Sequence, residues 1–204
     1  MTQHPTRAEL RIALFTTAYV VGFTAWFLSI GNLEFIVYVV TMLVLMALVG
    51  FSLRKAEYPP AILWALSAWG LMHMAGGGVP VDGSVLYNLV LWPMATVGDS
   101  VILKYDQVVH AFGFGVTALL LRHLVLRHFP ATRGTATALV YPALASMGLG
   151  ATNEMIEFTA VLMVPDTNVG GYINTALDLC FNALGAVLAM VATAVFQTRK
   201  RTRA

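Results

Sequence analysis

Charged residues are scarce in this chain of 204 residues: only 11% are Asp, Glu, Lys or Arg, while 58% are hydrophobic. An ordinary soluble domain is about 25% charged and about 45–50% apolar. The scarcity excludes a soluble globular enzyme and a disordered protein, and the lack of a basic patch excludes a nucleic-acid binder. The single cysteine, Cys180, excludes a disulfide framework and any cysteine-rich metal site.

What the sequence does contain is six long apolar runs with short connections between them. A helix that crosses a bilayer needs about 20 apolar residues, and each run is about that long. The runs are continuous, whereas the strands of a membrane barrel alternate polar and apolar residues. We therefore predict an all-α fold, in which residues 1–204 form one polytopic integral membrane bundle of six transmembrane helices. The predicted spans are 12–30, 35–53, 61–79, 101–121, 135–164 and 172–196.

The connection over residues 80–100 is the one long loop of this arrangement. It contains a short apolar piece, residues 85–92, which is too short to cross the bilayer. We expect this piece to lie at the membrane interface or to re-enter the membrane. The glycines at 76–78, just before the loop, either break the third helix beside a cavity or simply end it.

The basic residues indicate the orientation of the bundle. Lys and Arg accumulate in cytoplasmic loops of membrane proteins. With six spans, 11 of the 12 basic residues fall on one side of the membrane, and only Lys104 falls on the other. Both termini are therefore predicted to be cytoplasmic.

Four acidic residues lie inside the predicted helices, where they would be costly if they faced lipid: Asp106, Glu154, Glu157 and Asp178. An acid near the bilayer centre costs about 2.5 to 3.5 kcal/mol, so four of them would cost on the order of 10 kcal/mol. At a rise of about 1.5 Å per residue, all four fall within roughly 15 Å of the outer surface. These side chains must therefore face one another or a water-filled cavity.

Other polar residues share this depth and repeat at helical spacing. His110 follows Asp106 by four residues, and residues three or four apart lie on one face of a helix. The remaining candidates at or near this depth are His73, Asn153, Asn174 and Asn182.

The polar cluster is compatible with several kinds of chemistry. Carboxylates and histidines bind divalent metals in helix bundles, and the candidate ligands are His73, Asp106, His110, Glu154, Glu157 and Asp178. The same groups can serve as general acid and base, with Asp106, His110, Glu154, Glu157 and Asp178 as the candidate catalytic residues. They can also relay protons or a cation in a small transporter, or form a hydrogen-bond network that only stabilises packing.

Four sequence motifs around these residues resemble known membrane families. Residues 105–113 contain the Asp-x-x-x-His signature of VanZ-like proteins and of the related YjdF-type family of bacterial inner-membrane proteins. Residues 153–158 are similar to the Glu-x-x-Glu motif of the YjdF type, and residues 178–185 to the Asp-x-x-x-Asn-x-x-Gly motif of VanZ-like proteins. His73 with the following glycines is similar to a YjdF-type segment, although Asn174 stands where that type tends to have Asp.

The resemblance implies an uncharacterised multi-pass protein of the bacterial plasma (inner) membrane and cell envelope. It supports the site residues more than any reaction, because neither family has an agreed one. The leading hypothesis is a metal-binding or acid–base site that faces the outer leaflet and acts on an envelope or lipid-linked substrate. A proton- or cation-coupled transporter and a purely structural membrane protein remain the alternatives.

Overall fold

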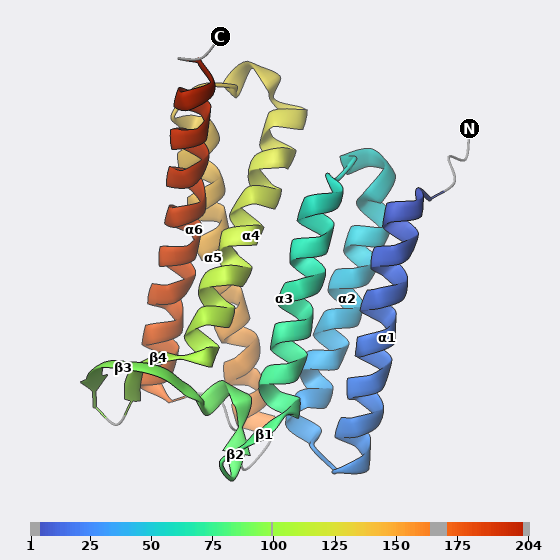
Figure 1. Ribbon diagram of the computed structural model, residues 1–204, viewed down its shortest axis with the longest axis vertical. Helices are drawn as coiled ribbons and strands as arrows, with labels where there is room; N and C mark the ends of the chain where they lie inside the picture. The colour runs from blue at the N-terminus through green and yellow to red at the C-terminus, as the bar shows by residue number, and fades with distance from the viewer. Residues whose placement is uncertain (1–4, 99, 164–170, 202–204) are drawn as a thin grey trace.

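The computed structural model describes residues 5–98, 100–163 and 171–201, and these residues form six α-helices along the long axis of the molecule (Figure 1). The helices are α1 (Arg7–Ser29), α2 (Leu33–Ala56), α3 (Pro60–Gly78), α4 (Tyr105–His128), α5 (Thr137–Met163) and α6 (Tyr172–Arg201). Helix α1 begins and α6 ends at the same end of the molecule (Figure 1). The prediction of a helical bundle is confirmed.

Local signals in the sequence explain where the first helices begin. Thr6 and Glu9 form a reciprocal capping box at the start of α1. Gly31 takes a positive φ of 66° in the turn between α1 and α2, and the Asn32 side chain accepts a hydrogen bond from the Phe35 backbone N–H at 3.2 Å. Pro60 occupies the first turn of α3, where no backbone N–H donor is needed.

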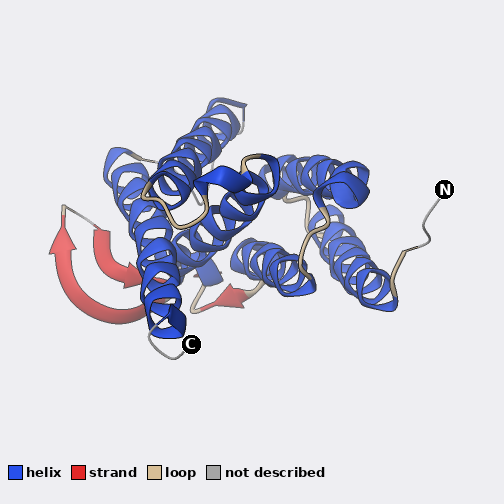
Figure 2. Ribbon diagram, turned by 90° about the horizontal axis from the view of Figure 1, so that it is seen from above, coloured by secondary structure: helices blue, strands red, loops and turns tan. Residues whose placement is uncertain are grey.

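The long loop before α4 forms two small antiparallel hairpins. Strands β1 (Pro80–Val81) and β2 (Ser84–Val85) make the first, followed by a short 3₁₀ turn, Leu86–Asn88. Strands β3 (Val90–Val97) and β4 (Ser100–Lys104) make the second. Figure 2 shows this second hairpin curving around the outside of the bundle.

The predicted fourth span, 101–121, is therefore wrong at its beginning. Residues 101–104 belong to β4, which pairs with β3, and the β-branched Val101 and Ile102 are typical of strands. Helix α4 starts at Tyr105 and continues to His128, seven residues beyond the predicted end.

Four of the helices are long and apolar enough to cross a membrane by length and composition: α1, α2, α4 and α6. The predicted set of six spans is not confirmed, because α3 and α5 are not among them. Both carry residues that lower mean hydropathy: α3 ends in three glycines and contains His73, and α5 contains Glu154 and Glu157.

The first three helices pack around aromatic side chains. Phe27, Phe35, Tyr38 and Met74 are buried together with Tyr87 from the 3₁₀ turn. The three glycines that end α3 provide room for this aromatic cluster, because a Cβ atom on any of them would overlap a phenyl or phenol ring. The sequence left two roles open for these glycines, a break in the helix beside a cavity or the end of the helix. The structure supports the helix end and shows that the glycines also allow close packing of the rings.

The last three helices pack through small residues, and α4 makes its most extensive contacts with α6. Gly185 of α6 lies so close to α4 that a Cβ atom there would overlap the Ala111 backbone. Ala118, Ala143 and Ala186 form a buried contact between α4, α5 and α6. Small residues let helix backbones approach closely in membranes.

Candidate metal centre

Helices α4, α5 and α6 together place five ionisable side chains in the interior. Asp106 lies in the first turn of α4 and His110 one turn later, Glu154 and Glu157 lie one turn apart on α5, and Asp178 lies on α6. None of the five is more than 7% exposed. We call these five residues the carboxylate–histidine cluster. The helical spacing recognised in the sequence does direct all five inward.

His110 is at the centre of the cluster. Its Nε2 atom lies 3.5 Å from Asp106 Oδ1 and 4.0 Å from Glu157 Oε1. Its Nδ1 atom lies 3.5 Å from Glu154 Oε1 and 2.9 Å from Asn182 Oδ1. Each ring nitrogen therefore faces a carboxylate, so one can bind an ion while the other is held in place by hydrogen bonding, as is typical of metal-bound histidines.

Four members of the cluster converge more closely than the fifth. One potential ligand atom from each of His110, Glu154, Glu157 and Asp178 lies within 4.8 Å of the others. An ion with four tetrahedral ligands at about 2.1 Å holds the ligand atoms about 3.4 Å apart, so side-chain movements of about 1 Å would close this group around it. Asp106 reaches His110 but does not belong to this convergent group.

Three amide side chains support the carboxylates. Asn153 Nδ2 donates to Glu157 Oε1 at 2.8 Å, and Asn174 Nδ2 donates to Asp178 Oδ2 at 2.6 Å. Asn182 Nδ2 donates to Glu154 Oε1 at 3.4 Å. All three asparagines singled out in the sequence thus lie beside an acid of the cluster.

Two carboxylate oxygens in the cluster have no such support. Glu154 Oε2 and Asp178 Oδ1 are buried and have no hydrogen-bond partner among the described residues. Glu154 is 6% exposed and Asp178 is fully buried. An unpartnered buried acceptor is costly, so these two oxygens are available for a cation or a proton.

His73, the remaining candidate ligand, belongs to different surroundings. Its Nδ1 atom is hydrogen-bonded to the Tyr87 hydroxyl, and its ring packs edge-on against Tyr38 with centroids 5.2 Å apart. It is not among the four residues whose ligand atoms converge. Here His73 contributes to the aromatic packing between α3 and the loop that precedes α4.

A family model described as "Predicted membrane protein (DUF2238)" matches residues 10–199, almost the whole chain. The chain belongs to this family. No match to this chain was found among the curated proteins or among the solved structures.

The DUF2238 match covers every residue of the carboxylate–histidine cluster. It confirms the prediction of a membrane protein family, but it carries neither the VanZ-like nor the YjdF-type name. The many large apolar side chains on the surface agree with a lipid environment; Phe51, for example, is 90% exposed.

Some residues that shape the cluster of this DUF2238 protein were not predicted from the sequence. The Phe114 ring stacks on the His110 imidazole, with centroids 6.3 Å apart and planes inclined by 23°. Gly150 leaves room for the Asn182 amide, since a Cβ atom there would lie 2.8 Å from Asn182 Nδ2. The i,i+4 spacing of Phe114 and His110 could have suggested the first contact, whereas the second joins two helices and has no local signal.

Proposed function

We propose that this protein binds a divalent metal ion within the carboxylate–histidine cluster and that the bound ion is the centre of its activity. The convergence of four buried ligand atoms from three helices carries the proposal. The two unpartnered oxygens, Glu154 Oε2 and Asp178 Oδ1, support it independently, because they are buried acceptors that an ion would satisfy.

The charges in the cluster favour a bound cation. Four buried acids surround a single imidazole, so even with His110 protonated the acids would retain excess negative charge when ionised. Buried charges persist only when they are paired or coordinated to a metal. A divalent ion supplies the missing positive charge, and three carboxylates with one imidazole form a ligand set suited to Mn²⁺, Fe²⁺ or Zn²⁺.

The ligand roles follow from the geometry. His110, Glu154, Glu157 and Asp178 hold the ion, and such an ion acts as a Lewis acid or lowers the pKa of a bound water. Asn182 Oδ1, 2.9 Å from His110 Nδ1, would orient the imidazole and leave Nε2 for the ion, while Asp106 lies outside the convergent group at 3.5 Å from Nε2.

The proposed setting is the bacterial inner membrane. The six helices would be six spans with both termini in the cytoplasm, as the distribution of basic residues favours. The cluster then lies in the outer half of the membrane and faces an envelope or lipid-linked substrate. The resemblance to VanZ-like and YjdF-type proteins supports this setting.

Metal analysis of the purified full-length protein tests the proposal. We expect close to one divalent ion per chain in the wild type and a large loss of that ion in Glu154→Gln and Asp178→Asn, which keep the side-chain shape. Asp82→Asn is the matched control, because Asp82 has a positive φ of 49° in the outer turn, which Asn tolerates, and lies outside the cluster.

The proposal is wrong if neither the wild type nor any variant retains an ion after loading with Mn²⁺, Fe²⁺ and Zn²⁺ in turn. In that case, a pH-dependent ion flux in proteoliposomes would favour a proton relay. If instead the metal-free wild type is folded and Asp178→Asn lowers its stability, the cluster would be a packing network.

A further inference from the structure

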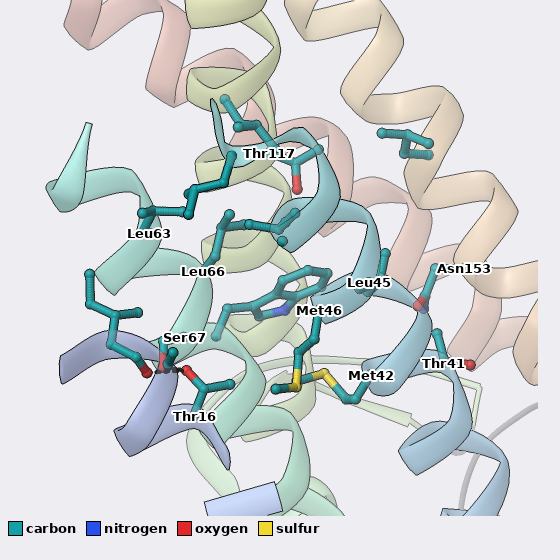
Figure 3. A pocket seen from close by; sticks show the side chains of 18 of the residues that line it. Thr16, Thr41, Met42, Leu45, Met46, Leu63, Leu66, Ser67, Thr117 and Asn153 are labelled. Atoms are coloured by element: carbon teal, nitrogen blue, oxygen red, sulfur yellow. Dashed lines mark hydrogen bonds between the residues drawn. The ribbon is translucent and has the colours of Figure 1, made fainter. Parts of the chain in front are cut away.

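A second feature of the interior is a cavity of about 380 Å³ between α1, α2, α3, α4 and α5 (Figure 3). Small-molecule sites are typically about 300–1,000 Å³, so the cavity is large enough for a ligand. Its lining includes none of the five residues of the carboxylate–histidine cluster.

The cavity is elongated along the helices. Its lining on α1 runs from Glu9 to Tyr19, and on α2 from Thr41 to Leu53. These stretches correspond to about 15 and about 18 Å at a rise of 1.5 Å per residue. The cavity therefore has the direction of lipid chains in a bilayer and the length of an extended hydrocarbon chain rather than that of a compact solute.

The walls offer little to a polar ligand, because their hydroxyl groups already have partners. Thr16 Oγ1 and Ser67 Oγ lie 2.7 Å apart in a mutual hydrogen bond, and Tyr19 donates to the Ser67 carbonyl oxygen at 3.0 Å. Thr117 donates to the Gly113 carbonyl oxygen within α4 at 2.9 Å. The remaining lining is mainly aliphatic, methionine and aromatic, and apolar cavities of this kind exclude water and accept apolar ligands.

The cavity opens sideways, toward the surface of the bundle. Leu45 of α2 and Leu149 of α5 both line it, and they are 40% and 47% exposed. Helices α2 and α5 make few contacts with each other. The opening therefore lies between two helices on a surface that faces lipid in the proposed membrane setting.

One polar residue links the cavity to the cluster. Asn153 lines the cavity, and its Nδ2 atom donates to Glu157 Oε1 at 2.8 Å. Figure 3 shows Asn153 of α5 and Thr41 of α2 on the same side of the cavity. An apolar chain inside the cavity would thus end beside the residue that holds one of the proposed metal ligands.

We propose that the cavity binds one hydrocarbon chain of a membrane lipid, which enters between α2 and α5, and that the polar end of the lipid lies toward Asn153 and the cluster. The role of the cluster in this inference rests on the proposed function, whereas chain binding does not. The inference narrows the substrate class to lipids that carry at least one long hydrocarbon chain.

Tryptophan quenching tests chain binding directly. Trp69 lines the cavity and is partly buried against Phe114, whereas Trp64 is 41% exposed on the same helix. In single-tryptophan variants, with the other tryptophans replaced by Phe, the full-length protein is reconstituted into phosphatidylglycerol vesicles with brominated acyl chains. We expect bromine to quench Trp69 as well as Trp64, because a chain in the cavity reaches the buried ring.

Two neighbouring substitutions localise the effect. Thr41→Phe fills the cavity at its side opening, while Val40→Phe adds the same ring at a position that is 56% exposed and does not line the cavity. We expect Thr41→Phe to remove most of the Trp69 quenching and Val40→Phe to leave it unchanged. Trp64 quenching should persist in both variants, which shows that they are inserted in the membrane.

The inference is overturned if Trp64 is quenched and Trp69 is not, or if Thr41→Phe and Val40→Phe leave Trp69 equally quenched. Measuring the metal content of the same wild-type preparation separates the two proposals. Undiminished Trp69 quenching in a wild-type protein that binds no metal would support the lipid site and contradict the proposed function. Metal binding without Trp69 quenching would support the proposed function and contradict the lipid site.

Discussion

The two halves of the bundle are both built from apolar helices, yet they are held together differently. Helices α1–α3 pack through large rings, such as Phe27 and Phe35, whose planes stack with centroids 5.2 Å apart. Helices α4–α6 pack through glycine and alanine, which bring the backbone of Gly185 against that of Ala111.

The polar groups of the two halves differ in the same way. In the first half, the buried polar pairs are neutral, as in the hydrogen bond between Thr16 and Ser67. In the second half, close backbone packing encloses ionisable side chains around His110. In the two proposals, the first half supplies most of the wall of the lipid site, and the second half supplies the ligands of the metal site.

The largest expected effect is on the close approach of α4 and α6. Gly185→Ala places a methyl group against the Ala111 backbone, which cannot rotate away as a side chain can. We expect the free energy of unfolding to fall by about 3 kcal/mol, measured by thermal or denaturant unfolding in detergent. Gly148→Ala is the control, because a Cβ atom there has no neighbour within 4 Å. An equal loss in both variants would refute the role of close packing.

Metal removal should affect only the second half. If an ion is present at about 100 times its dissociation constant, its removal lowers stability by about 2.7 kcal/mol. We expect a chelator to lower the melting temperature of the wild type and to leave that of Glu154→Gln unchanged. A chelator effect of equal size in both proteins would contradict the proposed site.

A smaller effect is expected for the histidine of the first half. His73→Phe keeps the ring between Tyr38 and Tyr87 but removes one hydrogen bond of the Tyr87 hydroxyl. The loss should be about 1 kcal/mol of unfolding free energy, with metal content unchanged in elemental analysis. A large drop in bound metal would instead assign His73 to the metal site, as the sequence hypothesis allowed.

The smallest effect concerns an exposed ion pair that joins the two halves. Arg127 of α4 donates to Glu57 Oε2 at 2.6 Å, and this contact holds the pKa of Glu57 below its usual value. The pair therefore contributes stability above the usual Glu pKa and loses it as the pH falls through the lowered pKa. Glu57→Gln should lower the melting temperature slightly at pH 7 and not at all in strong acid. A difference in melting temperature between wild type and variant that grows as the pH falls would contradict this role of the pair.

Much of the helical architecture could be predicted because apolar length is a property of continuous sequence. The error at residues 101–104 shows the limit of that reasoning. Val101, Ile102 and Leu103 are apolar enough to extend a helix, but pairing with β3 makes them a strand. Strand pairing depends on a partner elsewhere in the chain, and no local pattern reveals it.

The cluster could be predicted only in part, because spacing along one helix is visible in the sequence and the arrangement of different helices is not. Spacing along one helix correctly directed Asp106 and His110 to the same interior, since residues four apart share a helix face. Depth also grouped His73 with them, although His73 lies against Tyr87 and outside the convergent group. Depth is only one coordinate, and it does not tell how helices are arranged around one another.

The sequence by itself determined that this protein is a helical membrane protein with a few acids that must be kept from lipid, because the cost of charge in a bilayer does not depend on how the helices are arranged. Only the tertiary structure decided which acids meet His110, which oxygens remain unpartnered, and that Asn153 lies between the cluster and an apolar cavity. Except for the pairs four residues apart on one helix, these are contacts between different helices, and they are set by side-chain size at the helix interfaces, such as the missing side chains of Gly150 and Gly185.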